Sequence, residues 1–588
     1  MRFRPFWLDI LRLSLLLSFL LPLLACNLAS GVFPTATLPP TVVPSASPLP
    51  PTATPTSTPS PTSFSTATPT HFPFALPNDV ALLTSSVRFH PDPFVVQGDW
   101  VGAEVQPYVP SDRMAAIRGL KVNVYLGSDT QAAPIAQGKI EYFGFAGNLQ
   151  ATLYNLLPTT DLIGEQTFTF WLDPDDELQE GDENAENNVL TVTLDILPSQ
   201  QKPAREVGMN WIMRETECCY LLYLSGTAAE RDIEQIETLA NDTVKRAEIA
   251  MQSTAPEKIR LTLLDKVWGQ GGFANKDGIA VTYIDRDYTG DELVQVLHHE
   301  VIHDMDNYVK PSMLTEGLAV YLTGGHYKSE PLTERAAAAL RLGLFIPLPV
   351  LVENFYDHQH EIGYLEGAAF LEWLVALYGK EKMFEFLGNF PQNGSDLRRL
   401  DTALQETFGM GVAEADSAWQ AYLQAVEVSP RWQADLQNTL ALLDTARRYQ
   451  ERFVPSAHFA IAWTPPLKES QENQRIADFT RIPNQAENVT IELLLSTAGK
   501  AIYAGDEAQA QAYLDAANTV LDTAQGTDIR TLDFSANWLA QQTYQIVQAL
   551  LVENLEVQAL IMQDGKALVT VTDRSDWGTL RELVVSLD

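Results

Sequence analysis

Between residues 79 and 198, apolar and polar positions alternate with a period of two in short runs. The clearest runs are 121–126, 167–172 and 190–196, and clusters of Asp, Asn, Gly and Pro separate them. Alternation of this kind turns one face of a strand towards a core and the other towards solvent. The pattern predicts a small all-β sandwich over residues 76–199.

The pattern changes between residues 204 and 430. Apolar runs predict strands at 219–224, 258–264 and 278–284. Apolar residues that recur every three or four positions predict helices at 228–252, 291–308, 312–322, 333–342, 364–378, 380–387 and 411–425. A small sheet followed by a helical half predicts an α+β domain.

Residues 431–588 carry weaker patterns. Two helical runs, 487–503 and 506–523, predict an antiparallel helix pair that turns at Gly505. Alternating runs at 557–562 and 567–572 flank Asp-Gly, which predicts a β-hairpin. We expect a mainly helical C-terminal region with a hairpin, and the sequence assigns it no function.

The first 26 residues combine a basic start with an apolar run at 13–24 that is too short for a comfortable membrane span. The run ends in Leu-Leu-Ala-Cys26, which resembles the lipobox of bacterial lipoproteins. The resemblance implies a signal peptide over 1–26 and lipidation of Cys26. It also implies an extracytoplasmic protein that is lipid-anchored to the bacterial cell membrane. Plain secretion after cleavage is the alternative.

Residues 27–75 contain no Asp, Glu, Lys or Arg and are rich in Pro, Thr and Ser. This composition cannot build a core and favours polyproline II. We expect a disordered stalk that holds the folded parts away from the membrane.

The whole chain of 588 residues carries 75 acidic and 39 basic side chains, a formal net charge of −36. Such a chain repels phosphate backbones, so we expect no nucleic-acid partner. Of the three cysteines, only Cys218 and Cys219 lie beyond the lipobox. We expect two thiols at the start of a buried strand, with a vicinal disulfide as the alternative.

The candidate chemistry lies in His299-Glu300-Val301-Ile302-His303. On a helix, positions i and i+4 share one face, so both imidazoles can reach one metal ion, with Glu300 beside it. A catalytic zinc site has three protein ligands and one open position. Glu316 follows in Leu-Thr-Glu-Gly-Leu-Ala-Val-Tyr on the next predicted helix and can complete the ligand set.

Three alternatives stay open. Both histidines can be core residues of an amphipathic helix, and Glu316 can be a solvated acid. Asp306, one turn after His303, can replace Glu316 as the third ligand.

The motif His-Glu-x-x-His followed by Leu-Thr-Glu-Gly-x-Ala-x-Tyr resembles the gluzincins, the thermolysin- and aminopeptidase-like metallopeptidases also called peptidase MA-like. The resemblance implies a thermolysin-like α+β domain over 204–430 and one Zn²⁺ per chain. It implies that the zinc ligands are His299, His303 and Glu316 and that Glu300 is the general base.

The resemblance also implies groups that contact the substrate. Tyr364 is the expected oxyanion donor, with His358 and His360 as rivals. Residues 271–274 and the strand at 278–284 resemble the edge strand of the family, which pairs with an extended peptide. The expected substrate-binding residues are therefore Gly278, Ile279, Ala280 and Val281.

These features together predict a surface-tethered zinc metallopeptidase that hydrolyses peptide bonds in peptides or proteins. The aminopeptidase branch grips a free N-terminus with a Gly-x-Met-Glu-Asn segment, whereas residues 271–275 lack the Glu, which favours endopeptidase action. One alternative is a non-catalytic cell-surface binding or adhesion lipoprotein that uses the peptidase fold as a scaffold. Another is a zinc hydrolase that acts on a non-peptide amide.

The loop at 173–188 resembles the signature loop of the CARDB family, an immunoglobulin-like domain of bacterial surface proteins. The resemblance implies an immunoglobulin-like adhesion or spacer module that contacts a cell-surface or cell-wall partner. Clustered carboxylates suit a calcium ion, and Asp173, Asp175 and Glu177 are candidate ligands. We expect instead that these acids are solvated and that Glu186, Asn187 and Asn188 bond the loop backbone.

Overall fold

The computed structural model describes residues 79–110, 114, 116–143, 148–178, 182, 184–255, 257–269, 271–458, 463–524, 534–563, 566–573 and 576–586. The expected signal peptide, Cys26 and the stalk lie outside these residues, as does the Asp-Gly turn of the expected hairpin. None of the described helices is both long and apolar enough to cross a membrane.

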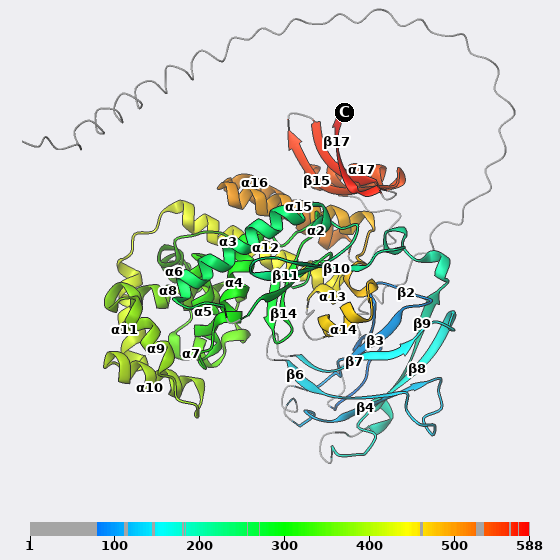
Figure 1. Cartoon of the computed structure of the whole chain (residues 1–588), viewed down its shortest axis with the longest axis horizontal. Helices are drawn as coiled ribbons and strands as arrows, with labels where there is room; N and C mark the ends of the chain where they lie inside the picture. Colours follow the sequence, from blue (N-terminus) through cyan, green and yellow to red (C-terminus); the bar gives the residue numbers. More distant parts are fainter. Residues whose placement is uncertain are drawn as a thin grey trace, which may run out of the picture. The chain divides into compact units, whose positions relative to one another are not determined.

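The N-terminal part consists of two β-sheets. One has the strand order β1 (Val87–His90), β3 (Trp100–Val105), β7 (Asn148–Pro158), β6 (Glu141–Phe143). The other has the order β2 (Val95–Val96), β9 (Val189–Leu197), β8 (Gly164–Leu172), β4 (Lys121–Leu126), β5 (Ala136–Lys139). The strands of both sheets lie in the blue and cyan part of Figure 1. Side chains from both sheets, among them Val101, Val122, Phe168 and Phe170, form one core. The strands expected at 121–126, 167–172 and 190–196 lie within β4, β8 and β9.

The acidic loop after β8 satisfies its own backbone. The Asp173 carboxylate accepts hydrogen bonds from the backbone N–H groups of Glu177 and Leu178 at 2.9 and 2.8 Å. Asp173 is buried, so the expectation that it is a solvated acid is wrong. The Asp175 carboxylate pairs with Lys121. Among the described residues, these acids do not converge on a common point as metal ligands would.

A five-stranded sheet forms the centre of the next part, with the order β10 (Trp211–Glu215), β11 (Cys219–Leu224), β12 (Ile259–Leu264), β14 (Gly278–Thr282), β13 (Gly272–Asn275). Strands β11, β12 and β14 are parallel, and β10 and β13 run antiparallel at the two edges. Because β13 covers the outer side of β14, the expected edge position is wrong for Gly278, Ile279, Ala280 and Val281 and is confirmed for residues 272–274, which lie in β13. The edge strand is β13.

The structure also corrects the expected state of the cysteines. Cys218 and Cys219 form a vicinal disulfide immediately before and at the start of β11. The alternative to free thiols is therefore the observed state. The backbone N–H of Cys218 donates to Asn241 at 3.0 Å, which anchors this turn to a helix.

Helices flank and follow the sheet. They are α2 (Ala228–Arg231), α3 (Ile233–Met251), α4 (Leu293–Met305), α5 (Ser312–Thr323), α6 (Leu332–Arg341), α7 (Leu348–Glu353), α8 (His360–Tyr378), α9 (Lys380–Gly388), α10 (Asp396–Phe408) and α11 (Val412–Ala425). The helix expected at 228–252 is divided at Asp232, whose φ and ψ of −103° and 11° are not helical. Helix α8 begins four residues earlier than expected, because the Gln359 side chain caps it by accepting from the Ile362 N–H at 3.0 Å.

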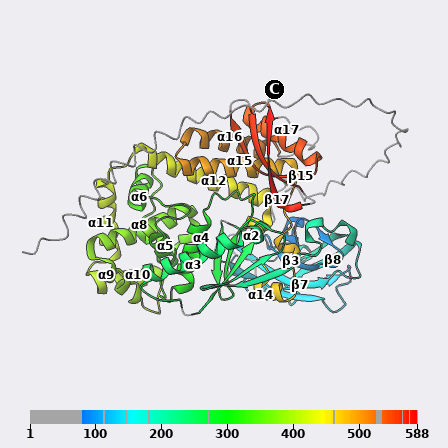
Figure 2. The same cartoon turned by 45° about the horizontal axis from the view of Figure 1, so that its top comes forward.

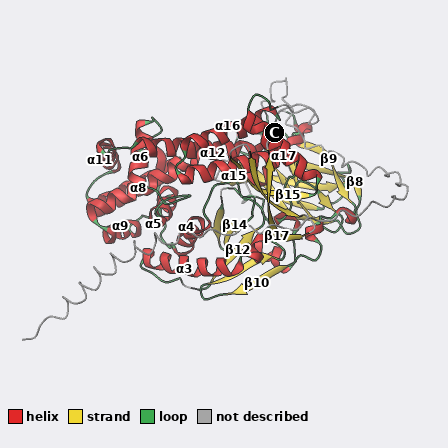
Figure 3. Ribbon diagram, turned by 90° about the horizontal axis from the view of Figure 1, so that it is seen from above, coloured by secondary structure: helices red, strands yellow, loops and turns green. Residues whose placement is uncertain are grey.

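The C-terminal region contains α12 (Pro430–Phe453), α13 (Pro455–His458), α14 (Leu467–Glu472), α15 (Ala486–Ala504), α16 (Glu507–Thr523) and α17 (Trp538–Val552). Its sheet has three strands, β15 (Leu555–Gln563), β16 (Lys566–Asp573) and β17 (Asp576–Ser586), where a two-stranded hairpin was expected (Figure 2). Helix α6 packs against both α8 and α12 (Figure 3). The long helix α12, which sequence periodicity did not predict, therefore joins the C-terminal region to the helices that follow the central sheet.

Candidate metal centre

Helix α4 is held against the central sheet by a buried apolar face that includes Val296, Leu297, Val301 and Ile302. The sheet approaches it closely at Gly272 of β13. A Cβ atom at Gly272 would lie 2.8 Å from a methyl carbon of Val296, so only glycine fits there. The edge strand and the helix that carries the His-Glu-x-x-His motif are thus neighbours.

Helix α5 is positioned by backbone contact with α8. A Cβ atom at Gly317 would lie 2.5 Å from the carbonyl carbon of Gly367, so the two glycines let the helices touch. Gly317 directly follows Glu316 in the sequence. The close packing of α5 on α8 therefore sets the position of the Glu316 side chain.

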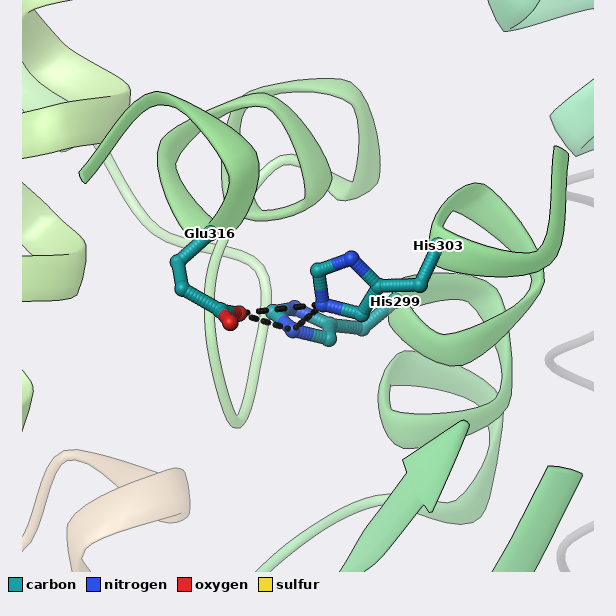
Figure 4. Close-up of side chains that lie close together, drawn as sticks. All are labelled: His299, His303 and Glu316. Atoms are coloured by element: carbon teal, nitrogen blue, oxygen red, sulfur yellow. Dashed lines mark hydrogen bonds and ion pairs between the residues drawn. The ribbon is translucent and has the colours of Figure 1, made fainter. Parts of the chain in front are cut away.

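His299 and His303 from α4 and Glu316 from α5 converge on one point (Figure 4). The Nε2 atoms of the two imidazoles are 2.9 Å apart. The Oε2 atom of Glu316 lies 3.2 Å from Nε2 of His299 and 3.0 Å from Nε2 of His303. Among the described residues this is the one group of three or more His, Cys, Asp or Glu side chains with such convergence.

The donor set and its dimensions fit zinc. Two imidazole nitrogens and one carboxylate oxygen are ligands that Zn²⁺ takes in catalytic sites, at bond lengths of about 2.0–2.1 Å. Tetrahedral bonds of that length separate neighbouring donor atoms by roughly 3.4 Å, close to the observed 2.9–3.2 Å. Burial lowers the pKa of His303, but nearby carboxylates, above all Glu316, outweigh it and raise that pKa to about 9. The negative charge of these carboxylates, which stabilises a protonated His303, would equally stabilise a bound metal cation.

Glu300 lies beside this triad and is almost fully buried. The backbone N–H of Ala274 in the edge strand β13 donates a hydrogen bond to its carboxylate. Burial raises the pKa of Glu300 to about 7, against the lowering effects of His303 and of this hydrogen bond. A carboxylate with a pKa near neutrality can take up and release a proton at physiological pH.

Two residues near the triad, Tyr356 and Asp306, differ in their relation to it. The hydroxyl of Tyr356 lies 3.4 Å from Oε1 of Glu316 and donates to it, which leaves Oε2 turned towards the histidines. Asp306 is not part of the converging group, because its carboxylate accepts from the N–H of Tyr308 at 3.0 Å and pairs with Lys310. The alternative of Asp306 as the third ligand is therefore not supported.

The expected oxyanion donor and its rivals lie at the start of α8. The Tyr364 ring is buried and stacks near the His299 ring, with 6.0 Å between centroids. His360 stacks on Tyr364 at 4.1 Å. Its Nδ1 atom lies 3.5 Å from a guanidinium nitrogen of Arg447 on α12. Nε2 of His358 is buried without a hydrogen-bond partner among the described residues.

The sequence analysis missed His326. Its ring lies 5.5 Å from that of His299 and 4.5 Å from that of Tyr364, between centroids. His326 follows Gly324-Gly325, directly after the helix that carries Glu316. A glycine pair after a ligand-bearing helix permits the chain to turn back towards the site. This pair is the sequence feature that could have indicated His326. Tyr356 was missed as well, because no spacing rule singles it out.

The chain was compared with protein families, curated proteins and solved structures. No protein-family model matches this sequence, and no curated protein matches it. Among solved structures, yeast LTA4 hydrolase in complex with bestatin is similar at 12% identity and a TM-score of 0.32, over 82% of this chain and 96% of that one. An M1 zinc metallopeptidase from Deinococcus radiodurans is similar at 12% identity and a TM-score of 0.27, over 61% and 97% of the two chains. An aminopeptidase N family protein from Idiomarina loihiensis has 11% identity and a TM-score of 0.25, over 59% and 77%.

Proposed function

We propose that this protein is a zinc-dependent peptidase. The convergence of His299, His303 and Glu316, with the buried carboxylate of Glu300 beside them, carries the proposal. Two imidazoles and one carboxylate leave one position of a tetrahedral metal open. A structural zinc site, by contrast, has four protein ligands.

A zinc ion held by the triad would supply a Lewis acid that polarises the scissile carbonyl. Glu300 accepts a proton from the attacking water and passes it to the leaving amine, which its pKa near 7 permits. The N–H of Ala274 holds the Glu300 carboxylate in place. Tyr364 is the proposed donor to the developing oxyanion.

The substrate we propose is an extended peptide or protein segment. Strand β13 is the edge of the central sheet and is in contact with Glu300 through Ala274. An edge strand offers unpaired backbone groups to an incoming peptide. This assigns main-chain recognition to β13 in place of β14. Endopeptidase action is the proposed mode, since residues 271–275 lack a glutamate for a free N-terminus.

We also propose that the chain is anchored outside the cytoplasm through lipidated Cys26 and that the N-terminal sandwich faces a cell-surface or cell-wall partner. The lipobox-like end of the leader supports the first part, and the CARDB-like loop supports the second. The alternative to the whole proposal is a non-catalytic surface module that keeps the peptidase fold as a scaffold.

Substitution of the proposed base tests catalysis. Glu300→Gln keeps the size of the side chain but removes its basicity, so we expect kcat on quenched fluorescent peptides to fall by about 10²–10⁴-fold. The measurement compares both proteins, from Phe74 to Asp588, at equal zinc content. Equal activity in the two proteins would overturn the assigned mechanism.

Metal analysis tests the site without knowledge of the substrate. We expect about one zinc per chain by elemental analysis, and none after His303→Ala. Because zinc binds the folded state, its removal by a chelator should lower Tm, and the shift should be absent in the variant. No zinc in the wild-type protein after reconstitution would favour the scaffold alternative.

A further inference from the structure

The loop between α5 and α6, residues 324–331, returns to the metal centre. Gly324 ends α5 with φ of 83°, and Gly325 follows with φ of 152°. A Cβ atom at Gly325 would lie 1.8 Å from the carbonyl oxygen of Lys328, so the turn requires glycine. This turn places the His326 ring 5.5 Å from the His299 ring and 4.5 Å from the Tyr364 ring, between centroids.

One nitrogen of His326 is held by a buried carboxylate. Nδ1 lies 2.9 Å from Oε2 of Glu361, which is fully buried on α8. The other carboxylate oxygen of Glu361 accepts from Arg335 at 3.3 Å. Because an ionised carboxylate only accepts hydrogen bonds, Nδ1 of His326 must carry its proton. The tautomer and the orientation of the ring are thereby fixed.

The other nitrogen is available. Nε2 of His326 has no hydrogen-bond partner among the described residues and is not enclosed, since the side chain keeps 10% of its surface exposed. A histidine that only fills a core would have both nitrogens buried and satisfied. Here one nitrogen is anchored and the other reaches open space next to a proposed metal ligand.

The anchor is itself held by an ion-pair network. Arg335 on α6 is fully buried and pairs with Glu330, Glu361 and Asp435. Asp435 lies on α12 of the C-terminal region and also pairs with Lys328 of the loop. Five charged groups buried in this way are costly unless they fix a geometry or are fully paired. The network ties the loop to α6, α8 and α12.

We propose that His326 is a second substrate-contacting residue, whose Nε2 atom hydrogen-bonds the bound peptide beside the metal ligands. Glu361 and Arg335 are positioning residues that act through it, and α12 contributes to the active site through Asp435. This inference rests on the proposed peptidase function. It also gives the C-terminal region a role that the sequence left open.

A pair of isosteric variants tests the proposal. His326→Asn places an amide near the former Nδ1 and keeps a bond to Glu361, but it has no atom at the Nε2 position. His326→Gln places its amide at the Nε2 position. If Nε2 contacts the substrate, His326→Asn lowers kcat/KM on quenched fluorescent peptides by about 10–10³-fold, and His326→Gln retains more activity. If His326 served only to bond Glu361 through Nδ1, His326→Asn would retain more activity than His326→Gln.

Binding provides a readout besides activity. In the Glu300→Gln protein loaded with zinc, we expect addition of His326→Asn to raise the Kd for a fluorescein-labelled peptide, chosen because the wild type cleaves it, by about tenfold. Addition of His326→Gln should change the Kd less. The positioning variant Glu361→Gln should lower kcat/KM less than His326→Ala, because the ring remains present. His458→Asn on α13 is the matched control and should leave kcat/KM unchanged.

Each outcome has one meaning. Equal kcat/KM and Kd in His326→Asn and its parent protein, at equal zinc content and Tm, would overturn the role of His326 while leaving the peptidase intact. Loss of zinc or of folding in His326→Asn but not in His326→Gln would overturn it as well. A zinc-loaded wild type that cleaves none of the peptides would refute the peptidase function itself, and the inference would fall with it.

Discussion

At the scale of single residues, Lys266 is a buried basic side chain whose charge is poorly compensated. Its side chain is buried and its ammonium group has no hydrogen-bond partner among the described residues. The ammonium group lies 5.5 Å from the centre of the Trp463 ring. Burial lowers the pKa of Lys266, and the carboxylates of Asp92 and Asp478 only partly oppose this. Because the unfolded chain holds this proton more strongly, Lys266 lowers the free energy of unfolding at pH values below the pKa of the lysine in the unfolded state.

We expect Lys266→Met to stabilise the protein by about 1–3 kcal/mol at neutral pH, since an unpaired buried polar group is replaced by an apolar one of similar size. Between the folded and the unfolded pKa of this lysine, the unfolded state binds more protons, so wild-type stability rises with pH there. The difference in Tm between variant and wild type should therefore shrink as pH increases from 7 towards 10. A constant or growing difference would refute the assignment.

The sequence predicted the metal triad for a local reason. Spacing of i and i+4 on one helix fixes two imidazoles on one face, and the resemblance added Glu316 on the next helix. His326 and Tyr356 could not be found this way, because loops without periodicity bring them to the site. The Gly317 and Gly367 contact that positions Glu316 is likewise invisible without the fold.

At the scale of elements, strand order was the part of the central sheet that sequence could not supply. Strands β11, β12 and β14 were predicted from their apolar runs, whereas the four residues of β13 were placed at the edge only through the resemblance. The short strand takes the edge position and displaces β14 to the interior. β13 and β14 pair as a tight hairpin, with Asn275 opposite Gly278. Local patterns do not encode the parallel pairing of β12 with β14, which places this hairpin at the side of the sheet.

The segment between β14 and α4 leads directly into the metal-binding helix and is held by the C-terminal region. Arg286 in this segment is fully buried and pairs with Glu492 of α15 and Glu556 of β15. It also donates to Asn484 at 3.1 Å and to the carbonyl of Pro483 at 3.2 Å. One side chain thus ties α15 and β15 to the segment that begins α4.

Replacement of this arginine should be costly. Arg286→Met leaves Glu492 and Glu556 without their shared cation, and we expect a loss of about 3–5 kcal/mol, seen as a lower midpoint of urea unfolding. Zinc should also be lost at lower chelator concentration, because the start of α4 is loosened. Arg448→Met, which breaks an exposed pair with Asp522, is the matched control and should cost at most about 1 kcal/mol. Similar losses in the two variants would contradict this account.

At the scale of the whole molecule, the N-terminal sandwich is joined to the rest of the described chain by specific contacts. Arg481, in the C-terminal region, pairs with Asp99 of the sandwich and with Glu206 of the connecting segment, at 2.6 and 2.8 Å. The rings of His90 and Trp463 stack with 3.7 Å between centroids. A module that swings freely as a spacer would not bury such groups. The sandwich is better described as a fixed part of the folded protein.

This arrangement makes cooperative unfolding the expected behaviour. Arg481 is almost fully buried, so Arg481→Met leaves two carboxylates unpaired and weakens the junction rather than either core. We expect the wild-type protein from Phe74 to Asp588 to unfold in one calorimetric transition and Arg481→Met to show a separate, earlier transition for the sandwich. Lys121→Met, which removes an exposed pair inside the sandwich, should leave a single transition. Two well-separated transitions in the wild type would show that the sandwich folds independently, and the spacer role would then regain its support.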